Sequence, residues 1–208
     1  MSAIWKTTVD TPVGALLLLA EDDALVGVAF SGRGSAPVAD PPTEPAHPVL
    51  AQARTQLGEY FAGLRTRFEL PLRAQGTDFQ RRVWAALAEI AYGETRSYSE
   101  IAARVEQPKA VRAVGAANGR NPVAIVIPCH RVIGADGSLT GYGGGTATKG
   151  WLLRHERAVL ASRGSSSSQT QFWASPSDSP PLVPRRRSVD QTRLSPFLVL
   201  AKRSPRRV

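Results

Sequence analysis

Short apolar runs separated by turn-forming residues open the chain. The turns lie at Asp10-Thr11-Pro12 and at Glu21-Asp22-Asp23. The runs between them predict three short strands, over residues 4–9, 15–20 and 25–30, that form an antiparallel meander. Residues 31–48 are rich in Gly, Pro and Ala and are expected to form a loop.

Apolar residues at helical spacing follow this loop and predict a helix over residues 49–62 that ends at Gly63. The apolar positions of this helix are Leu50, Ala53, Leu57, Tyr60 and Phe61. Residues 68–72 predict a last strand or an extended linker. We place a domain boundary after this segment, so that residues 1–76 form a first domain, a small antiparallel sheet with one helix.

Helical patterning returns at Thr77-Asp78, a suitable N-cap pair, and predicts an amphipathic helix over residues 79–91. Two shorter helices are predicted next, one from Ser97 or Ser99 to Val105 and one over residues 109–118. Two short helices joined by a tight turn match the helix-turn-helix pattern.

The β-branched run from Val123 to Ile127 predicts a short strand that ends at Pro128. A glycine loop follows over residues 141–145, and a final helix is predicted over residues 149–160. Residues 77–160 are therefore expected to form a second, mainly helical domain. The whole chain is predicted to belong to the α/β (α+β) fold class.

Charge divides the chain into three regions. Residues 1–78 carry 6 basic and 9 acidic side chains, residues 79–160 carry 11 and 6, and residues 161–208 carry 9 and 2. The last region is dominated by Ser, Pro and Arg, which predicts a disordered basic tail. This tail fits a solvated arm that attracts phosphates, and it equally fits a non-native reading-frame extension.

Composition narrows the class of protein. The single cysteine of the chain excludes an intramolecular disulfide and a Cys-rich zinc site, so we expect no metal. The apolar run Ala15 to Ala20 is far shorter than the roughly 20 residues of a membrane-spanning helix. Residues 1–10 lack the pattern of a secretory signal. We therefore expect no membrane partner and a cytoplasmic protein.

The chemically informative block is Ile127-Pro128-Cys129-His130-Arg131-Val132. A cysteine attacks as the thiolate, and a neighbouring base or positive charge lowers its pKa. His130 and Arg131 supply both possibilities. A lone cysteine is also commonly a buried small hydrophobe, so the rest of the sequence must decide.

Ordered motifs over residues 79–157 make the chain resemble the O6-alkylguanine-DNA alkyltransferase family, also called methylated-DNA–protein-cysteine methyltransferases. The matching blocks are Phe79-Gln80-Arg81-Arg82-Val83-Trp84, Tyr92-Gly93-Glu94-Thr95, Ser97-Tyr98, Asn121-Pro122-Val123, Pro128-Cys129-His130-Arg131-Val132, Tyr142-Gly143-Gly144-Gly145 and Lys149-Gly150-Trp151-Leu152-Leu153-Arg154-His155-Glu156. Residues 1–78 resemble the more variable N-terminal domain of that family.

The resemblance implies single-turnover DNA repair without a cofactor, in which Cys129 accepts an alkyl group from O6 of a guanine flipped out of double-stranded DNA. His130 would deprotonate Cys129 through a water, and Glu156 would orient His130. Asn121 would tie the turn before the strand to the active-site turn. A monomer is expected, associated with the nucleoid, or nuclear if the source is eukaryotic.

The resemblance also implies a set of DNA- and base-binding residues. Arg112 would fill the space that the flipped base leaves, and Tyr98 would push on the phosphate 3′ to the target and hydrogen-bond the base. Tyr142 and the flexible glycines, Gly143 and Gly144 among them, would form the pocket wall, with Gly143 at a position where many relatives carry Ser. Arg131 is assigned to the same set.

Blander interpretations of the same residues stay open at this point. Without the resemblance, Glu156 is an exposed helix carboxylate, Asn121 belongs to an ordinary turn, Tyr98 is a core aromatic and Arg112 is a solvated side chain. Two other functions are also considered. One is a non-catalytic lesion-binding protein, which the presence of Cys129 disfavours. The other is a cysteine hydrolase that uses Cys129, His130 and Glu156, for which no oxyanion-hole motif is found.

Overall fold

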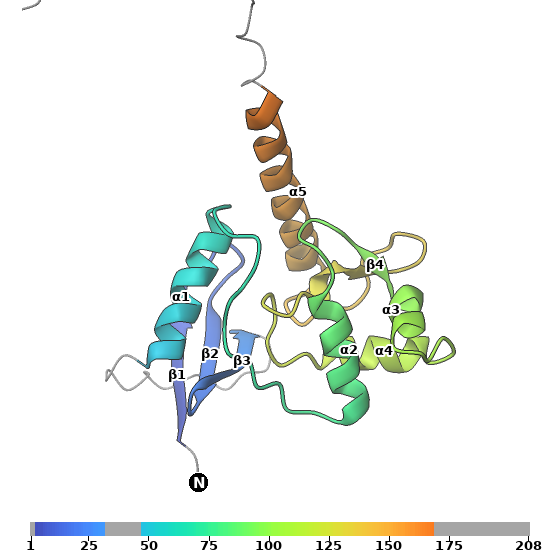
Figure 1. The fold of residues 1–208 in the computed structure, drawn as a ribbon, viewed down its shortest axis with the longest axis horizontal. Coiled ribbons are helices and arrows are strands. Elements are labelled where there is room, and N and C mark those ends of the chain that lie inside the picture. The colour runs from blue at the N-terminus through green and yellow to red at the C-terminus, as the bar shows by residue number, and fades with distance from the viewer. Residues whose placement is uncertain (1–2, 32–46, 169–208) are drawn as a thin grey trace, which may run out of the picture. The chain divides into compact units, whose positions relative to one another are not determined.

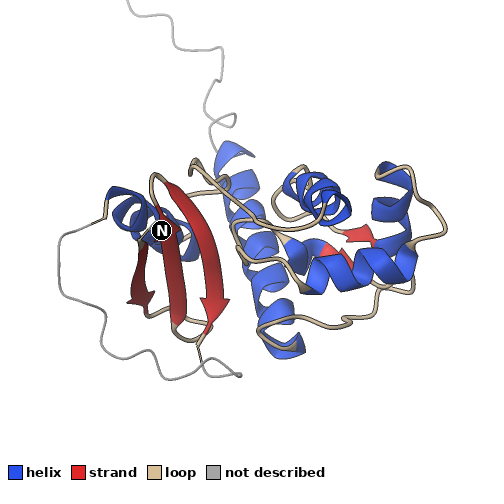
Figure 2. Cartoon of the chain, turned by 90° about the horizontal axis from the view of Figure 1, so that it is seen from below, coloured by secondary structure: helices blue, strands red, loops and turns tan. Residues whose placement is uncertain are grey.

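An antiparallel sheet begins the structure, a computed structural model that describes residues 3–31 and 47–168. Strands β1 (Ile4–Val9), β2 (Leu16–Glu21) and β3 (Ala24–Phe30) pair in the order β1-β2-β3. Figure 2 shows the three strands side by side. Leu16, Leu18 and Ala20 are buried at alternate positions of β2, because successive side chains of a strand point to opposite faces. The predicted meander is confirmed.

Helix α1 (Pro48–Phe61) packs against this sheet (Figure 1). Its buried residues include Leu50, Ala53, Leu57 and Tyr60, the same apolar stripe that the sequence predicts. The chain leaves α1 through Gly63, whose φ of 74° suits glycine. Residues 68–72 form an extended segment that bridges the sheet only where Leu72 pairs with Leu25.

The helices of the second half begin at well-formed caps. Helix α2 (Asp78–Ala88) starts at Thr77, which forms a capping box with Gln80. Helix α3 (Tyr98–Arg104) starts at Ser97, which forms the same motif with Glu100. Helix α4 (Val111–Gly119) packs against both α2 and α3, so the predicted helix-turn-helix forms as α3 and α4.

The predicted strand before the cysteine is wrong. Val123 bridges β3 at Val28, but the chain then turns, and Ile125 adopts a φ of 71°. The apolar run is buried throughout, which suits a buried turn as well as a strand, and composition does not separate the two. The turn leads directly into the 3-10 helix η1 (Cys129–Arg131). Strand β5 (Val132–Ile133) then pairs in parallel with β4 (Arg96–Ser97).

Helix α5 (Thr146–Ser168) is longer than the predicted helix over 149–160. Val159 packs against Gly63 and Leu160 against Gly93, while Nη2 of Arg163 donates to the Gly63 carbonyl at 2.7 Å. These contacts with distant parts of the chain extend the helix into the segment that composition assigns to the tail. The remainder of that predicted tail, residues 169–208, lies outside the described residues. None of the described helices has the length and apolar character needed to cross a membrane.

Candidate active site

Cys129 is held at the start of η1 by a short network of backbone and amide hydrogen bonds. Its own N–H donates to the Ile127 carbonyl at 2.8 Å. The Asn121 side chain donates to the same carbonyl at 2.8 Å and accepts from the Val123 N–H at 3.0 Å. Asn121 therefore ties the turn over 121–127 to the residue that carries the thiol.

The thiol of Cys129 is almost fully buried, with 4% of the residue exposed. Burial raises the pKa of Cys129, and the Asn121 side chain and the positive charge of Lys149 oppose this effect only in part. The resting cysteine is consequently a thiol, and a base must take its proton before it can attack.

His130 provides such a base from the next position in η1. Its Nε2 lies 2.8 Å from Oε1 of Glu156, and both side chains are fully buried. Burial lowers the pKa of His130 despite the opposing hydrogen bond and charge of Glu156, so the imidazole is neutral at rest. Because an ionised carboxylate can only accept, Nε2 carries the proton and Nδ1 is an acceptor. Nδ1 has no hydrogen-bond partner within the described chain.

Glu156 stays ionised in the core because donors surround its carboxylate. Oε1 accepts from Tyr60 at 2.8 Å, Oε2 accepts from the Gly93 N–H at 2.9 Å, and Arg131 donates to both oxygens. Burial alone would raise the pKa of Glu156, but the hydrogen bonds from His130 and Arg131 and the positive charge of Arg131 outweigh it and lower the pKa to about 2.

The position of Arg131 corrects the expectation that it binds DNA or the base. Only 6% of the residue is exposed, and its guanidinium is committed to Glu156 and to the Ile90 carbonyl, which accepts at 2.7 Å. A buried carboxylate needs a partner of opposite charge, and the arginine beside the cysteine fills that need. Arg131 therefore supports Glu156 from the core side of the site.

An open cavity of about 580 Å³ lies between the helix-turn-helix and the glycine loop. It is lined by Tyr98, Val111, Gly115, Gly119, Thr140, Gly141, Tyr142 and Gly143. The Thr140 hydroxyl donates to the Tyr98 hydroxyl at 3.3 Å. The Tyr142 ring lines this cavity, and its centre lies 6.3 Å from the centre of the His130 ring. Burial raises the pKa of Tyr142.

The remaining residues expected at the DNA-binding surface differ in their exposure and in the contacts that they make. Gly143 is exposed, and a Cβ there would meet no atom within 4 Å. A Cβ on Gly144 would lie 2.9 Å from the Phe30 ring, so Gly144 allows β3 to approach the loop closely. Arg112 is exposed on the first turn of α4, next to Val111 in the cavity wall.

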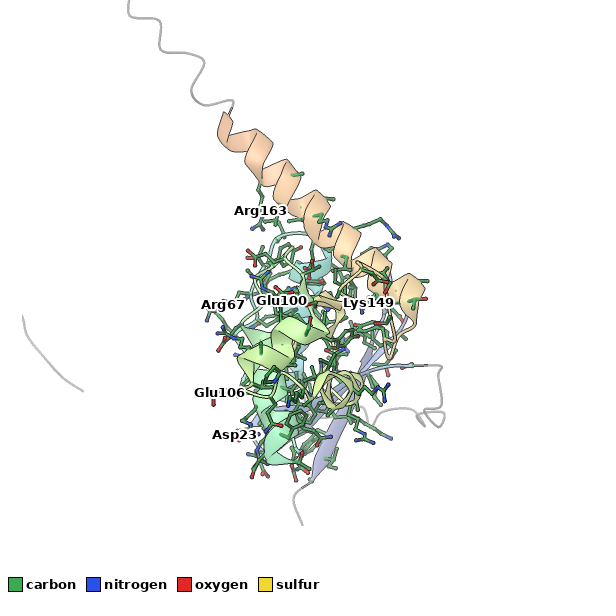
Figure 3. All side chains as sticks on the ribbon, turned by 90° about the vertical axis from the view of Figure 1, so that its right-hand side faces the viewer. Asp23, Arg67, Glu100, Glu106, Lys149 and Arg163 are labelled. Atoms are coloured by element: carbon green, nitrogen blue, oxygen red, sulfur yellow. The ribbon has the colours of Figure 1, made fainter. Side chains whose placement is uncertain are left out.

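Two residues of the site had no predicted role. Lys149 is fully buried at the start of α5 (Figure 3), and its Nζ donates to the Thr140 carbonyl at 2.9 Å and lies 5.8 Å from the centre of the Tyr98 ring. The sequence feature that could have indicated a role for Lys149 is its place at the start of the matching block Lys149 to Glu156. Tyr60 was recognised only as part of an apolar helix face, and no sequence pattern links it to Glu156. Within residues 3–31 and 47–168, no group of three or more His, Cys, Asp or Glu side chains is arranged to hold a metal ion.

Comparisons with known proteins agree with this arrangement. The family model described as the DNA binding domain of 6-O-methylguanine DNA methyltransferase matches residues 78–158, and the model of its ribonuclease-like domain matches residues 4–74. The methylated-DNA–protein-cysteine methyltransferase of Mycolicibacterium paratuberculosis is 53% identical over 150 residues, covering 72% of this chain and 90% of the relative. The constitutive enzyme of that name from Bacillus subtilis is 49% identical over 157 residues, covering 74% and 95%.

Solved structures give the same result. The crystal structure of the Mycobacterium tuberculosis O6-methylguanine methyltransferase superimposes with a TM-score of 0.69 at 46% identity, covering 75% of this chain and 94% of that one. The complex of the M. tuberculosis protein with DNA gives 0.67 at 49% identity, covering 73% and 92%. The chain belongs to the 6-O-methylguanine DNA methyltransferase family, as the resemblance in its motifs implies.

Proposed function

We propose that this protein repairs O6-alkylguanine in double-stranded DNA by moving the alkyl group irreversibly to Sγ of Cys129. The observation that carries the proposal is the fully buried pair of His130 and Glu156 next to the only cysteine of the chain. An inert structural cysteine needs no neighbouring base, whereas a nucleophile with a raised pKa does.

The proposed reaction balances in protons and electrons. Nδ1 of His130 takes the proton of the Cys129 thiol, through a water, and Glu156 stabilises the resulting imidazolium. The thiolate attacks the alkyl carbon, a C–S bond forms, and the C–O6 bond breaks with its electron pair left on the base. The base then takes up one proton from water and becomes guanine, and His130 releases to water the proton that it took from the thiol. The product thioether is a poor leaving group, so each molecule acts once.

Access to the base requires that the nucleotide leave the helical stack. The helix-turn-helix of α3 and α4 borders the cavity that would receive it, with Tyr98 at one end of α3 and Gly115 on α4. In this proposal the exposed side chain of Arg112 occupies the gap in the duplex. Tyr142 and Gly143 then form the wall that faces the alkyl group, and the protein works as a monomer.

Counting repaired bases tests this function. A fixed amount of protein is mixed with excess duplex that carries one O6-methylguanine per molecule, and the guanine restored is measured at completion. We expect one guanine per protein chain, and none with Cys129→Ser, which should still bind the duplex. Several guanines per chain would indicate a turnover enzyme, and repair by Cys129→Ser would exclude the cysteine as acceptor.

A further inference from the structure

One side chain of the N-terminal half, Tyr60 of α1, reaches the catalytic carboxylate. We propose that Tyr60 is a positioning residue for alkyl transfer: its hydroxyl holds Oε1 of Glu156 and, by sharing that oxygen with His130, limits how strongly Glu156 stabilises the charged imidazole. This inference rests on the function proposed above, because it assigns His130 the role of base.

The hydrogen bond from Tyr60 to Glu156 is short and fully buried. The hydroxyl lies 2.8 Å from Oε1, both residues are fully buried, and 96 positions of sequence separate them. Burial and the nearby Glu156 raise the pKa of Tyr60 well above its ordinary value, so the hydroxyl keeps its proton and acts as a donor.

The ring of Tyr60 is fixed from several sides, so the hydroxyl has one orientation. Phe61 and Tyr92 meet it edge-on with centroids at 5.2 and 5.9 Å, and Phe68 and His155 lie at 5.5 Å. Nε2 of His155 also lies 2.9 Å from the Tyr60 carbonyl, which fixes the backbone at the same point. A phenylalanine could make the same ring contacts, so packing alone does not require the hydroxyl.

Sharing one oxygen among donors has a consequence for the base. Oε1 of Glu156 faces Tyr60, His130 and Arg131 at once. Each donor withdraws electron density from the oxygen, and less is then available to stabilise the imidazolium of His130. Removing the neutral donor, Tyr60, should strengthen the bond from His130 to Glu156 and raise the pKa of His130. Only the neutral imidazole can accept the thiol proton. As the pH is lowered, the alkyl transfer would therefore be lost at a higher pH than in wild type.

Other titratable groups face the same site and would remain in place. They are Cys129 and Arg131 of η1, Lys149 and His155 of α5, Tyr142 of the glycine loop and Tyr92 after α2. A change of Tyr60 that spares the ring therefore isolates the effect of one hydroxyl. Tyr92→Phe is a matched control, because the Tyr92 ring packs on Tyr60 and its hydroxyl has no hydrogen-bond partner in the described part of the chain.

The test compares wild type, Tyr60→Phe and Tyr92→Phe, each shown to be folded by thermal unfolding. Nuclear magnetic resonance of the three histidines in the resting protein reports the Nε2–H proton of His130. We expect this signal to move downfield in Tyr60→Phe and to stay in place in Tyr92→Phe. The rate of Cys129 methylation by a methylated duplex should fall as the pH is lowered. The pH at which it falls to half of its maximum should be about half a unit higher in Tyr60→Phe than in wild type, and unchanged in Tyr92→Phe.

A second substitution tests the opposite direction. Replacing Tyr60 with 3-fluorotyrosine makes the hydroxyl a stronger donor while keeping the ring. The His130 Nε2–H resonance should then move upfield, and the methylation rate should fall at a lower pH than in wild type. The inference is overturned if either the His130 Nε2–H resonance or the pH dependence of the rate is the same in Tyr60→Phe as in wild type. It is also overturned if Tyr92→Phe shifts both by the same amount as Tyr60→Phe. Because the resonance experiment uses no substrate, its result separates this inference from the proposed function, which fails instead if wild-type Cys129 is never methylated.

Discussion

The two halves of the molecule contribute to the site in different ways. Residues 78–158 contain the thiol, the base and the carboxylate, and two of these are neighbours in sequence, Cys129 and His130. Residues 4–74 contain none of them. Two of their aromatic side chains reach the site: Tyr60 donates to Glu156, and Phe30 packs 5.5 Å from the Tyr142 ring and against Gly144. The comparison teaches that the reacting groups all lie in one half of the molecule, whereas some of the side chains that position them come from the other half.

The interiors of the two halves also differ in chemistry. Among the described residues, only two buried residues of the N-terminal half carry a polar side-chain group, Tyr60 with its hydroxyl and Gln56 with its amide, and Gln56 pairs with the backbone of Glu69. The C-terminal half buries His130, Arg131, Lys149 and Glu156 together. A core of apolar residues tolerates small changes, whereas a buried ionic cluster leaves uncompensated charge when one member is removed.

Glu156→Gln should produce the largest effect in the C-terminal half. It leaves the buried guanidinium of Arg131 without its counter-charge, so we expect a loss of about 3 to 5 kcal/mol in the free energy of unfolding. The rate of Cys129 methylation should fall by about a hundredfold, because the imidazolium of His130 loses its stabilising anion. Urea unfolding and single-turnover rates measure the two losses.

The control for this prediction is Glu59→Gln in the N-terminal half. It breaks the more exposed ion pair with Arg65 and should lower the free energy of unfolding by under about 1 kcal/mol. Equal losses of unfolding free energy in Glu156→Gln and Glu59→Gln would contradict the difference we infer between the two halves.

The stability of the protein should depend on pH through the same carboxylate. The pKa of Glu156 in the folded protein, about 2, lies below its ordinary value of 4.5. Its contribution is therefore complete above about pH 4.5 and is lost as the pH falls toward 2, with a total of about 3 kcal/mol. Urea unfolding at a series of pH values should show this loss in wild type, and Glu156→Gln should lack it. Parallel curves for the two proteins would show that Glu156 is not the group responsible.

Arg112→Ala should separate access to the base from chemistry within the C-terminal half. If Arg112 fills the vacated stack, repair of a methylated duplex should slow by about tenfold or more, while the reaction with a free O6-alkylguanine is nearly unchanged. Arg120→Ala removes the same charge from the exposed C-cap of α4, at the opposite end of the helix from Arg112, and should have a smaller effect. Equal losses on both substrates would indicate that Arg112 supports the fold.

The smallest expected effect concerns the part of the chain beyond both halves. Residues 169–208 carry 8 basic and 2 acidic side chains. Truncation after Ser168 should leave the reaction of Cys129 with a free base analogue unchanged. It should weaken DNA binding at low salt and flatten the dependence of affinity on salt, because fewer cations are released from the phosphates. Coincident salt slopes for the full and truncated chains would show that this segment does not contact DNA.

Local signals in the sequence were sufficient for much of the fold. The meander, the cap at Thr77 and the two short helices follow from turns, capping residues and spacing within a few positions. The strand predicted over Val123 to Ile127 failed because a buried apolar run fits a turn equally well. The burial of Arg131 and the role of Tyr60 could not be predicted, since both depend on contacts with Glu156 across 25 and 96 positions, which leave no periodic pattern.

The most direct test of the account is the mass of the protein after reaction with excess methylated duplex. The account predicts that every chain gains one methyl group in place of one hydrogen, and that fragmentation locates it on Cys129. The gain should persist after the DNA is removed, because the thioether is not reversed. An unmodified protein with repaired DNA, or a methyl group on any other residue, would contradict the central claim that Cys129 is the terminal acceptor.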